Sequence, residues 1–306
     1  MRRAAVLAGL LAGVGAGAPA TQAAERPPVT TYRVVQQLRL DEGQSGSFTL
    51  SCRPGDLVTD GMWQIDGLDS NPQLDDEPFD FVNGVDVLEA DSISTGGYRF
   101  SLRNNTEGFA QLRLAVVCLG GVLSDGTSRY ALRLSGPLAT TTPVAAETEA
   151  AQRVTCPSDT VAVTPGFRMV TEPGGVARVT SSFPPTPDLR TIERRTVALA
   201  DVEVTTTARC LSRLTGRRDG RRWRLGLALR TARATLTDGR RETYTASCRA
   251  RETAITGAFS LAGGWYVGQF PSGRQRSFRA QSPQTGANGA LQLGLLCLSD
   301  RAAAPK

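Results

Sequence analysis

The chain has 306 residues, of which 40% are hydrophobic and 21% charged, so its composition is that of a globular protein rather than a disordered one. It contains no histidine, which excludes Ser-His-Asp and Cys-His catalysis and histidine-based zinc sites. The net charge of +6 comes almost entirely from arginine, because Lys306 is the only lysine.

The charge is distributed unevenly along the chain. Residues 30–125 carry 15 acidic side chains against 6 arginines, whereas residues 126–306 carry 26 basic side chains against 13 acidic ones. An acidic half and a basic half predict one of two behaviours: self-association through opposite charge poles, or attachment of the basic half to an anionic surface.

The N-terminus has the pattern of a secretory signal peptide. Met1-Arg2-Arg3 is followed by an apolar stretch over residues 4–18 and by small residues up to Ala24. The apolar stretch is shorter than the ~18 residues that a membrane-spanning helix needs. We therefore expect residues 1–24 to be removed on export. The mature chain would then be secreted, periplasmic or at the cell surface, without a transmembrane anchor.

Six cysteines in an exported chain indicate three disulfides. Three of them follow a β-prone run and precede an aromatic residue by 11 positions, and the other three end runs with a buried face of period two, typical of strands. The two kinds alternate along the chain. This order predicts the pairs Cys52–Cys118, Cys156–Cys210 and Cys248–Cys297.

The repeated pattern predicts an all-β chain of three tandem disulfide-closed β-sandwich modules. We expect an acidic module over residues 25–127, a second over 128–215 and a basic third over 216–306. A strand headed by Tyr32, Tyr130 or Trp223 precedes each early cysteine. Residues 136–152 are rich in Pro, Thr and Ala, and form either a loop around an outer strand or, as we favour, an extended spacer that lets the first module move.

The spacing of each unit resembles that of the immunoglobulin-like sandwich: a cysteine, an aromatic 11 residues on, and a second cysteine 49–66 residues after the first. The resemblance implies that Trp63 is buried facing the cysteine-bearing strand. Val116, Ala208 and Leu295 replace the tyrosine usual two residues before the second cysteine. The family has a further strand after its second cysteine, and we expect none after Cys297. The strand headed by Tyr32, Tyr130 or Trp223 is extra to the immunoglobulin pattern. It either closes the preceding module or opens its own. We favour the second arrangement, which departs from the immunoglobulin order.

An acidic segment lies in the first module. Its members are Asp66, Asp69, Asp75, Asp76, Glu77 and Asp80. We favour a solvated loop. The alternatives are a Ca²⁺ site, which would be the only cofactor that the sequence indicates, and a carboxylate pair for glycoside hydrolysis.

A basic segment spans the boundary between the second and third modules. It carries Arg213, Arg217, Arg218, Arg221, Arg222 and Arg224 around Trp223, with Asp219-Gly220 predicting a hairpin turn. One interpretation is an anion-binding site with Trp223 stacked on a ligand ring, and the other is a solvated loop with Trp223 in the core. A further aromatic cluster, residues 263–270, is interpreted as core packing rather than a carbohydrate platform.

Repetition, disulfides and charge polarity favour an exported, non-enzymatic binding or structural protein of the envelope or extracellular space. Its expected partner is an anionic glycan, a lipid head group or an acidic protein, and nucleic acid is not expected because of export. The alternatives are a polysaccharide hydrolase that uses carboxylates of the first module, and a self-assembling surface protein.

Overall fold

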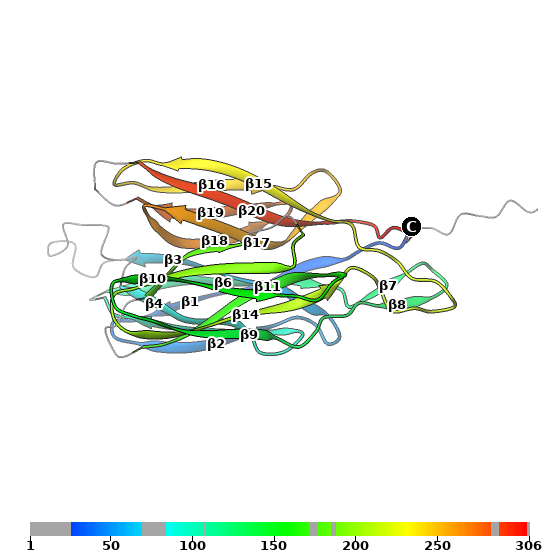
Figure 1. The fold of residues 1–306 in the computed structure, drawn as a ribbon, viewed down its shortest axis with the longest axis horizontal. Helices are drawn as coiled ribbons and strands as arrows, with labels where there is room; N and C mark the ends of the chain where they lie inside the picture. The colour runs from blue at the N-terminus through cyan, green and yellow to red at the C-terminus, as the bar shows by residue number, and fades with distance from the viewer. Residues whose placement is uncertain are drawn as a thin grey trace, which may run out of the picture.

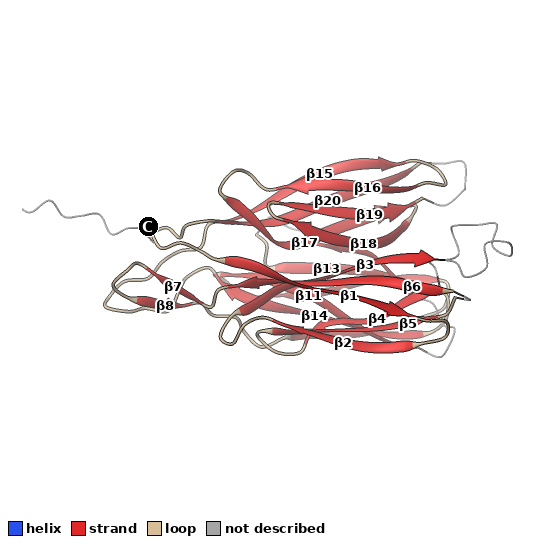
Figure 2. Cartoon of the chain, turned by 180° about the vertical axis from the view of Figure 1, so that it is seen from behind, coloured by secondary structure: helices blue, strands red, loops and turns tan. Residues whose placement is uncertain are grey.

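The computed structural model describes residues 26–68, 84–106, 108–171, 177–184, 188–282 and 288–304. Within these residues all regular elements are β-strands, which confirms the all-β prediction. The strands run along the long axis of the molecule (Figures 1 and 2).

Within the described residues, each disulfide closes a group of six strands, and we call these groups modules one, two and three. The strands of module one are β1 (Thr31–Leu40), β2 (Ser45–Ser51), β3 (Leu57–Leu68), β4 (Val85–Ser92), β5 (Gly97–Asn104) and β6 (Phe109–Leu119). Those of module two are β9 (Leu138–Val144), β10 (Thr148–Thr155), β11 (Thr160–Val170), β12 (Ala177–Phe183), β13 (Thr191–Ala198) and β14 (Val202–Ser212). Those of module three are β15 (Leu227–Leu236), β16 (Arg241–Ser247), β17 (Glu252–Ala262), β18 (Trp265–Ser272), β19 (Gln275–Gln281) and β20 (Gly289–Ser299). A short hairpin, β7 (Val122–Ser124) and β8 (Arg129–Ala131), follows module one.

The modules share their sheets in a threefold pattern. Sheet I has the order β1-β6-β3-β18-β19-β16, sheet II β2-β5-β4-β11-β14-β9 and sheet III β10-β13-β12-β17-β20-β15. Every six-stranded sheet thus joins the first, sixth and third strands of one module to the fourth, fifth and second strands of another. The third strands, β3, β11 and β17, contact one another at the centre of the molecule.

The opening strand of each module pairs with the strand of its own late cysteine. β1 is antiparallel to β6, β9 to β14 and β15 to β20. The first strand of each group therefore pairs within that group. The expected heads of two of these strands were wrong, because Tyr130 lies in β8 and Trp223 precedes β15. Both aromatics instead pack against each other near one end of the molecule, with ring centroids 6.2 Å apart.

Residues 136–152 are not a spacer. β9 pairs with β14 over seven residues and β10 pairs with β13 over eight, so this segment belongs to two of the sheets. Pro143 is accommodated because β9 is an edge strand, where a missing backbone N–H need not break a ladder. Low sequence complexity here reflects alternating small residues on an outer strand.

The three disulfides form as predicted, between Cys52 and Cys118, Cys156 and Cys210, and Cys248 and Cys297. In each pair one cysteine follows the second strand of its module and the other lies in the sixth strand. Because these two strands belong to different sheets, each bridge fastens two sheets face to face.

Candidate functional site

The basic segment forms a hairpin, as the sequence predicted; we call residues 213–224 the arginine hairpin. Arg218 and Arg221 exchange two backbone hydrogen bonds of 2.9 and 2.8 Å, and Leu214 lies opposite Arg224. The turn residues Asp219 and Gly220 have φ values of 48° and 73°. Positive φ at both positions defines a type I′ turn, for which Asp-Gly is a preferred pair.

The arginine hairpin is anchored by its tryptophan. Trp223 is only 5% exposed and stands edge-on to Tyr130. Of the two interpretations of Trp223, the one in the core describes its position, because its ring packs in the small core beneath the hairpin. Further anchors are backbone hydrogen bonds from Gly216 to Ala131 (2.9 Å) and from Arg224 to Ala303 (2.7 Å).

The guanidinium groups of the arginine hairpin face solvent. Five of its six arginines are exposed: Arg217, Arg218, Arg221, Arg222 and Arg224. Arg213 is half-buried and donates to the Asp188 carbonyl at 2.8 Å; burial and then the nearby charge of Arg224 lower its pKa. Apart from Arg218, 4.0 Å from Asp219, none of these arginines pairs with a carboxylate of the described residues. The arrangement concentrates unneutralised positive charge on a fixed hairpin.

The short β7–β8 hairpin extends this positive surface. Ser128 donates to the Asp219 carboxylate at 2.9 Å, which ties the tips of the two hairpins together. Arg129 and Arg133 are both exposed, and the Arg133 guanidinium lies beside Gly216. Figure 1 places β7 and β8 at one end of the molecule, near the last described residues of the chain.

Of the acidic segment, only Asp66 lies within the described residues; Asp69, Asp75, Asp76, Glu77 and Asp80 lie outside them. Asp66 forms an ion pair with Arg279 and accepts a hydrogen bond from Gln64 at 3.0 Å. Both of its oxygens are therefore engaged by protein donors, and neither is positioned as a ligand for a cation in this arrangement.

The other acidic side chains of β3 and β4 also face arginines. Within module one, Asp86 pairs with Arg103 at 2.7 Å and Glu89 with Arg99 at 2.8 Å. Three further pairs cross between modules. They are Asp60–Arg276, Asp66–Arg279 and Asp91–Arg168. Part of the attraction between the acidic and basic halves is thus satisfied within a single chain.

The aromatic residues that follow the early cysteines meet at the centre of the molecule. Trp63 stands edge-on to Phe167 at 5.9 Å and to Tyr266 at 5.6 Å, and Tyr266 stacks on Phe259 at 3.7 Å between ring centroids. The ring partners of Trp63 therefore come from the other two modules. Tyr266 belongs to the cluster at residues 263–270, for which core packing was the favoured interpretation, and its ring packs in the central core.

Sequence reasoning missed a set of buried charged and polar groups beside these rings. Asp60 and Arg276 are fully buried and form an ion pair, and the Asp60 carboxylate also accepts from the Gly257 amide at 2.8 Å. Arg194 is 2% exposed and lies 4.7 Å from the centre of the Phe167 ring. A usable sign was Thr59-Asp60-Gly61, where β3 carries a bulge next to Gly61. This glycine recurs in the third strands of the other two modules as Gly166 and Gly257.

A small cavity of about 60 Å³ opens next to the central rings. It is lined mainly by apolar side chains from all three modules, among them Trp63, Phe167, Met169 and Tyr266, with Asp86 and Arg178 as its charged members. Its size suits a few water molecules or one small group, not a sugar ring.

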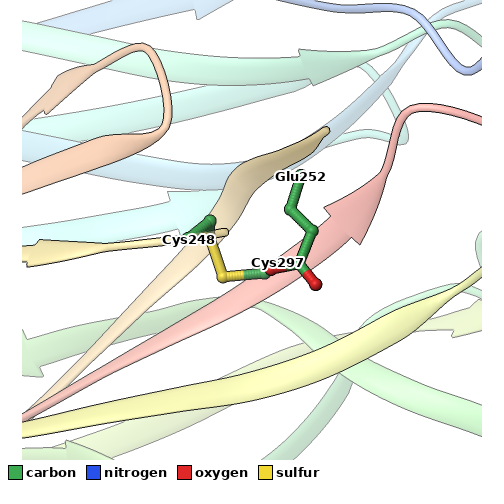
Figure 3. A group of neighbouring side chains, drawn as sticks. All are labelled: Cys248, Glu252 and Cys297. Atoms are coloured by element: carbon green, nitrogen blue, oxygen red, sulfur yellow. A yellow bond between two sulfur atoms is a disulfide. The ribbon is translucent and has the colours of Figure 1, made fainter. Parts of the chain in front are cut away.

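Three side chains of kinds that can bind a metal ion lie close together in module three. They are Cys248, Cys297 and Glu252 (Figure 3). The two sulfurs are joined in a disulfide, so neither is a thiolate ligand. Glu252 pairs with Arg230 at 2.5 Å. The group is therefore structural.

No protein-family model matches the sequence, and no curated protein matches it significantly. Among the described residues there is no helix long and apolar enough to cross a membrane.

Proposed function

We propose that the chain is an exported, non-enzymatic binding protein whose arginine hairpin attaches to an anionic component of the cell envelope or extracellular matrix. The observation that carries the proposal is the set of exposed guanidinium groups at Arg217, Arg221, Arg222 and Arg224, which have no carboxylate partner among the described residues. Guanidinium groups bind phosphate, sulfate and carboxylate through paired hydrogen bonds.

Rigidity supports a binding role for this surface. The type I′ turn, the buried Trp223 and the hydrogen bonds to Ala131 and Ala303 hold the hairpin in one position. A fixed array of charges loses less conformational freedom on binding than a mobile loop. Three disulfides and the signal-like N-terminus support export, since disulfides persist mainly in oxidising compartments.

Each module is proposed to be a variant of the immunoglobulin-like sandwich. Its second, fifth and fourth strands lie side by side, its third strand neighbours its sixth, and the disulfide joins the second and sixth. In that family the corresponding strands have the same neighbours and the same bridge. The departure is the opening strand, which pairs with the sixth strand where the family places its last one.

Two alternative functions have weaker support. A hydrolase using module one needs unpaired carboxylates. Of its candidate residues only Asp66 lies within the described part of the chain, where it pairs with Arg279. Self-assembly through charge poles competes with the ion pairs that already join the modules within one chain.

Binding to a phosphate- or carboxylate-bearing polysaccharide tests the proposal, with uncharged dextran as the negative control. The double variant Arg221→Gln/Arg222→Gln should bind roughly 30-fold more weakly, on the basis of ~1 kcal/mol for each arginine at an anionic surface. Arg233→Gln/Arg240→Gln removes the same charge from exposed positions outside the hairpin and should bind nearly as the wild type does. Equal losses in both variants would contradict a hairpin-specific site. Binding only to anionic lipid vesicles would assign the hairpin to a membrane surface instead.

A further inference from the structure

The arginine hairpin is part of a larger basic surface at the end of the molecule where β7 and β8 lie (Figure 1). Five segments lie side by side there, in the order 129–133, 213–216, 222–225, 300–303 and 26–29. Backbone amides join each neighbouring pair by donating from Gly216 to Ala131 (2.9 Å), Thr215 to Trp223 (2.9 Å), Arg224 to Ala303 (2.7 Å) and Ala302 to Pro27 (3.0 Å). We call the solvent-facing side of these five segments the end face.

The arginines of these segments lie on the end face because side chains of extended backbone point alternately to opposite sides. The inward side chains belong to one apolar core: Tyr130, Leu132, Trp223, Leu225 and Ala302. The exposed side chains that flank them in sequence include Arg129, Arg133, Arg222, Arg224 and Arg301. Since the inward residues share a single core, the arginines on the opposite side share a single face.

The end face extends beyond the arginine hairpin on both sides. The 213–216 segment has no outward arginine of its own, but a Cβ at Gly216 would lie 3.8 Å from the Arg133 guanidinium, which therefore supplies charge there. At the other margin Arg26 is exposed, two residues before Pro28, which pairs with Arg301. Hydrogen-bonded neighbours lie about 4.8 Å apart, so the four steps between the outermost segments span roughly 19 Å.

The charge of this surface is almost entirely positive. The segments and the hairpin turn together contain ten arginines and two aspartates, Asp219 and Asp300. Asp219 is already engaged, because it accepts a hydrogen bond from Ser128 at 2.9 Å. Neither of the margin arginines, Arg26 and Arg129, pairs with a carboxylate of the described residues. Binding of an anion therefore breaks no ion pair at either margin.

The partner must match both the spread and the character of this charge. A single phosphate or sulfate contacts only donors within about 3 Å, so it cannot reach both margins. Membrane-binding surfaces insert apolar side chains, and none of the exposed large apolar side chains belongs to these five segments. Single-stranded nucleic acids stack their bases on exposed aromatic rings, whereas Tyr130 and Trp223, the aromatic residues of these segments, are buried.

We propose that the end face binds a linear acidic polysaccharide in an extended conformation, laid across the five segments from Arg129 to Arg26. Sulfate or carboxylate groups along the chain contact the arginines of successive segments, and guanidinium groups suit both anions. The inference rests on the proposed function, because the arginine hairpin forms the middle of the end face. It adds the class of ligand and the length of the site.

Heparin-derived oligosaccharides of increasing length are the probe, because they carry sulfate and carboxylate groups on a linear chain. Calorimetric titration of the full-length protein should show affinity rising from the disaccharide to the hexasaccharide and changing little for longer chains. The slope of log affinity against log salt concentration should steepen over the same range, because each further contact releases bound counterions.

Three double variants locate the contacts. Arg26→Gln/Arg129→Gln removes one charge from each margin, and should weaken hexasaccharide binding roughly 30-fold while leaving disaccharide binding unchanged. Arg222→Gln/Arg224→Gln, in the middle of the end face, should weaken the binding of both. Arg233→Gln/Arg240→Gln removes the same charge from exposed positions outside the end face and should change neither.

The possible failures separate this inference from the proposed function. Equal affinities for disaccharide and hexasaccharide, or unchanged hexasaccharide binding by Arg26→Gln/Arg129→Gln, would overturn the extended site and leave binding to the arginine hairpin alone. Binding to phosphatidylserine vesicles but to no oligosaccharide would overturn the polysaccharide and keep the hairpin as a site for an anionic surface. Binding to neither would contradict the proposed function as well.

Discussion

Asp60 of β3 and Arg276 of β19 form a fully buried ion pair that joins module one to module three. Burial raises the pKa of Asp60, while the charge of Arg276 and the Gly257 amide act to lower it. The pair is a link between strands more than 200 residues apart in sequence. Asp60 lies in the acidic half of the sequence and Arg276 in the basic half, and the fold brings them together.

Breaking this pair on one side should be costly. Asp60→Asn leaves the Arg276 charge buried without a partner, so the free energy of unfolding should fall by about 3–5 kcal/mol. The double variant Asp60→Leu/Arg276→Met removes both charges, and should lose much less than the sum of the two single changes. Urea unfolding measures all of these free energies.

The exposed pair Arg39–Asp41 is the matched control for that experiment. Both side chains are more than half exposed, so Asp41→Asn should change stability by less than about 1 kcal/mol. A loss below 1 kcal/mol for Asp60→Asn would show that the central pair contributes little to stability.

The shared sheets predict that the modules unfold together. β4 of module one pairs with β11 of module two, and β3 pairs with β18 of module three. A fragment of residues 26–135 therefore exposes two unpaired inner strands and should aggregate or remain unfolded, even with its disulfide closed. The full chain should show one unfolding transition, the same by circular dichroism and by tryptophan fluorescence. A monomeric fragment with native-like NMR dispersion would contradict this prediction.

The disulfides and the module order could be predicted because they depend on local spacing. Cys118 and its counterparts end strands with a clear period of two, and the early cysteines share a fixed distance to an aromatic. The joining of strands from different modules into one sheet could not be predicted. Period-two patterning identifies the buried face of a strand, but it does not specify which strand pairs with its edge. The β4–β11 ladder, for example, has only two residue pairs, at Phe167–Ala90 and Arg168–Glu89.

Only the part of the candidate site that contains a run of charged residues, the arginine hairpin, could be predicted from the sequence. The arginine run and its Asp219-Gly220 turn could be identified directly, whereas a tryptophan within such a run fits a ligand platform and a core anchor equally well. The buried centre was missed because Asp60-Gly61 has the composition of a surface turn. Only the tertiary contact with Arg276 shows that Asp60 is an interior residue.

The recurring glycine of the third strand should be intolerant of a side chain at Gly61. A Cβ at this position would overlap the ring of Tyr98, which is itself fully buried. Gly61→Ala should therefore destabilise the protein by about 1–3 kcal/mol through overpacking. Gly136→Ala is the control, because a Cβ there meets no atom within 4 Å and should leave the thermal midpoint nearly unchanged. Equal thermal midpoints for the two variants would mean that the side chains around Tyr98 rearrange without loss of stability.

Glu252 should make stability depend on pH. Its carboxylate accepts two hydrogen bonds from Arg230, at 2.5 and 3.2 Å, and one from the Arg249 amide at 3.0 Å. The hydrogen bond from Arg230 is the main cause that lowers the pKa of Glu252, opposed by partial burial. The unfolded chain thus takes up this proton at a higher pH than the folded one. The stabilisation is complete above about pH 4.3, the usual glutamate value, and is lost as pH falls through the lower folded pKa.

Glu252→Gln should accordingly lower the free energy of unfolding by about 1 kcal/mol at pH 7, since the pair lies near the surface. The difference from wild type should shrink below about pH 4 and vanish once Glu252 is protonated in the folded protein. Urea unfolding at a series of pH values measures this difference directly. Glu203→Gln, at an exposed position of β14, should give no pH-dependent difference over the same range. A deficit for Glu252→Gln that stayed constant down to pH 2 would show that the interaction does not depend on the carboxylate charge.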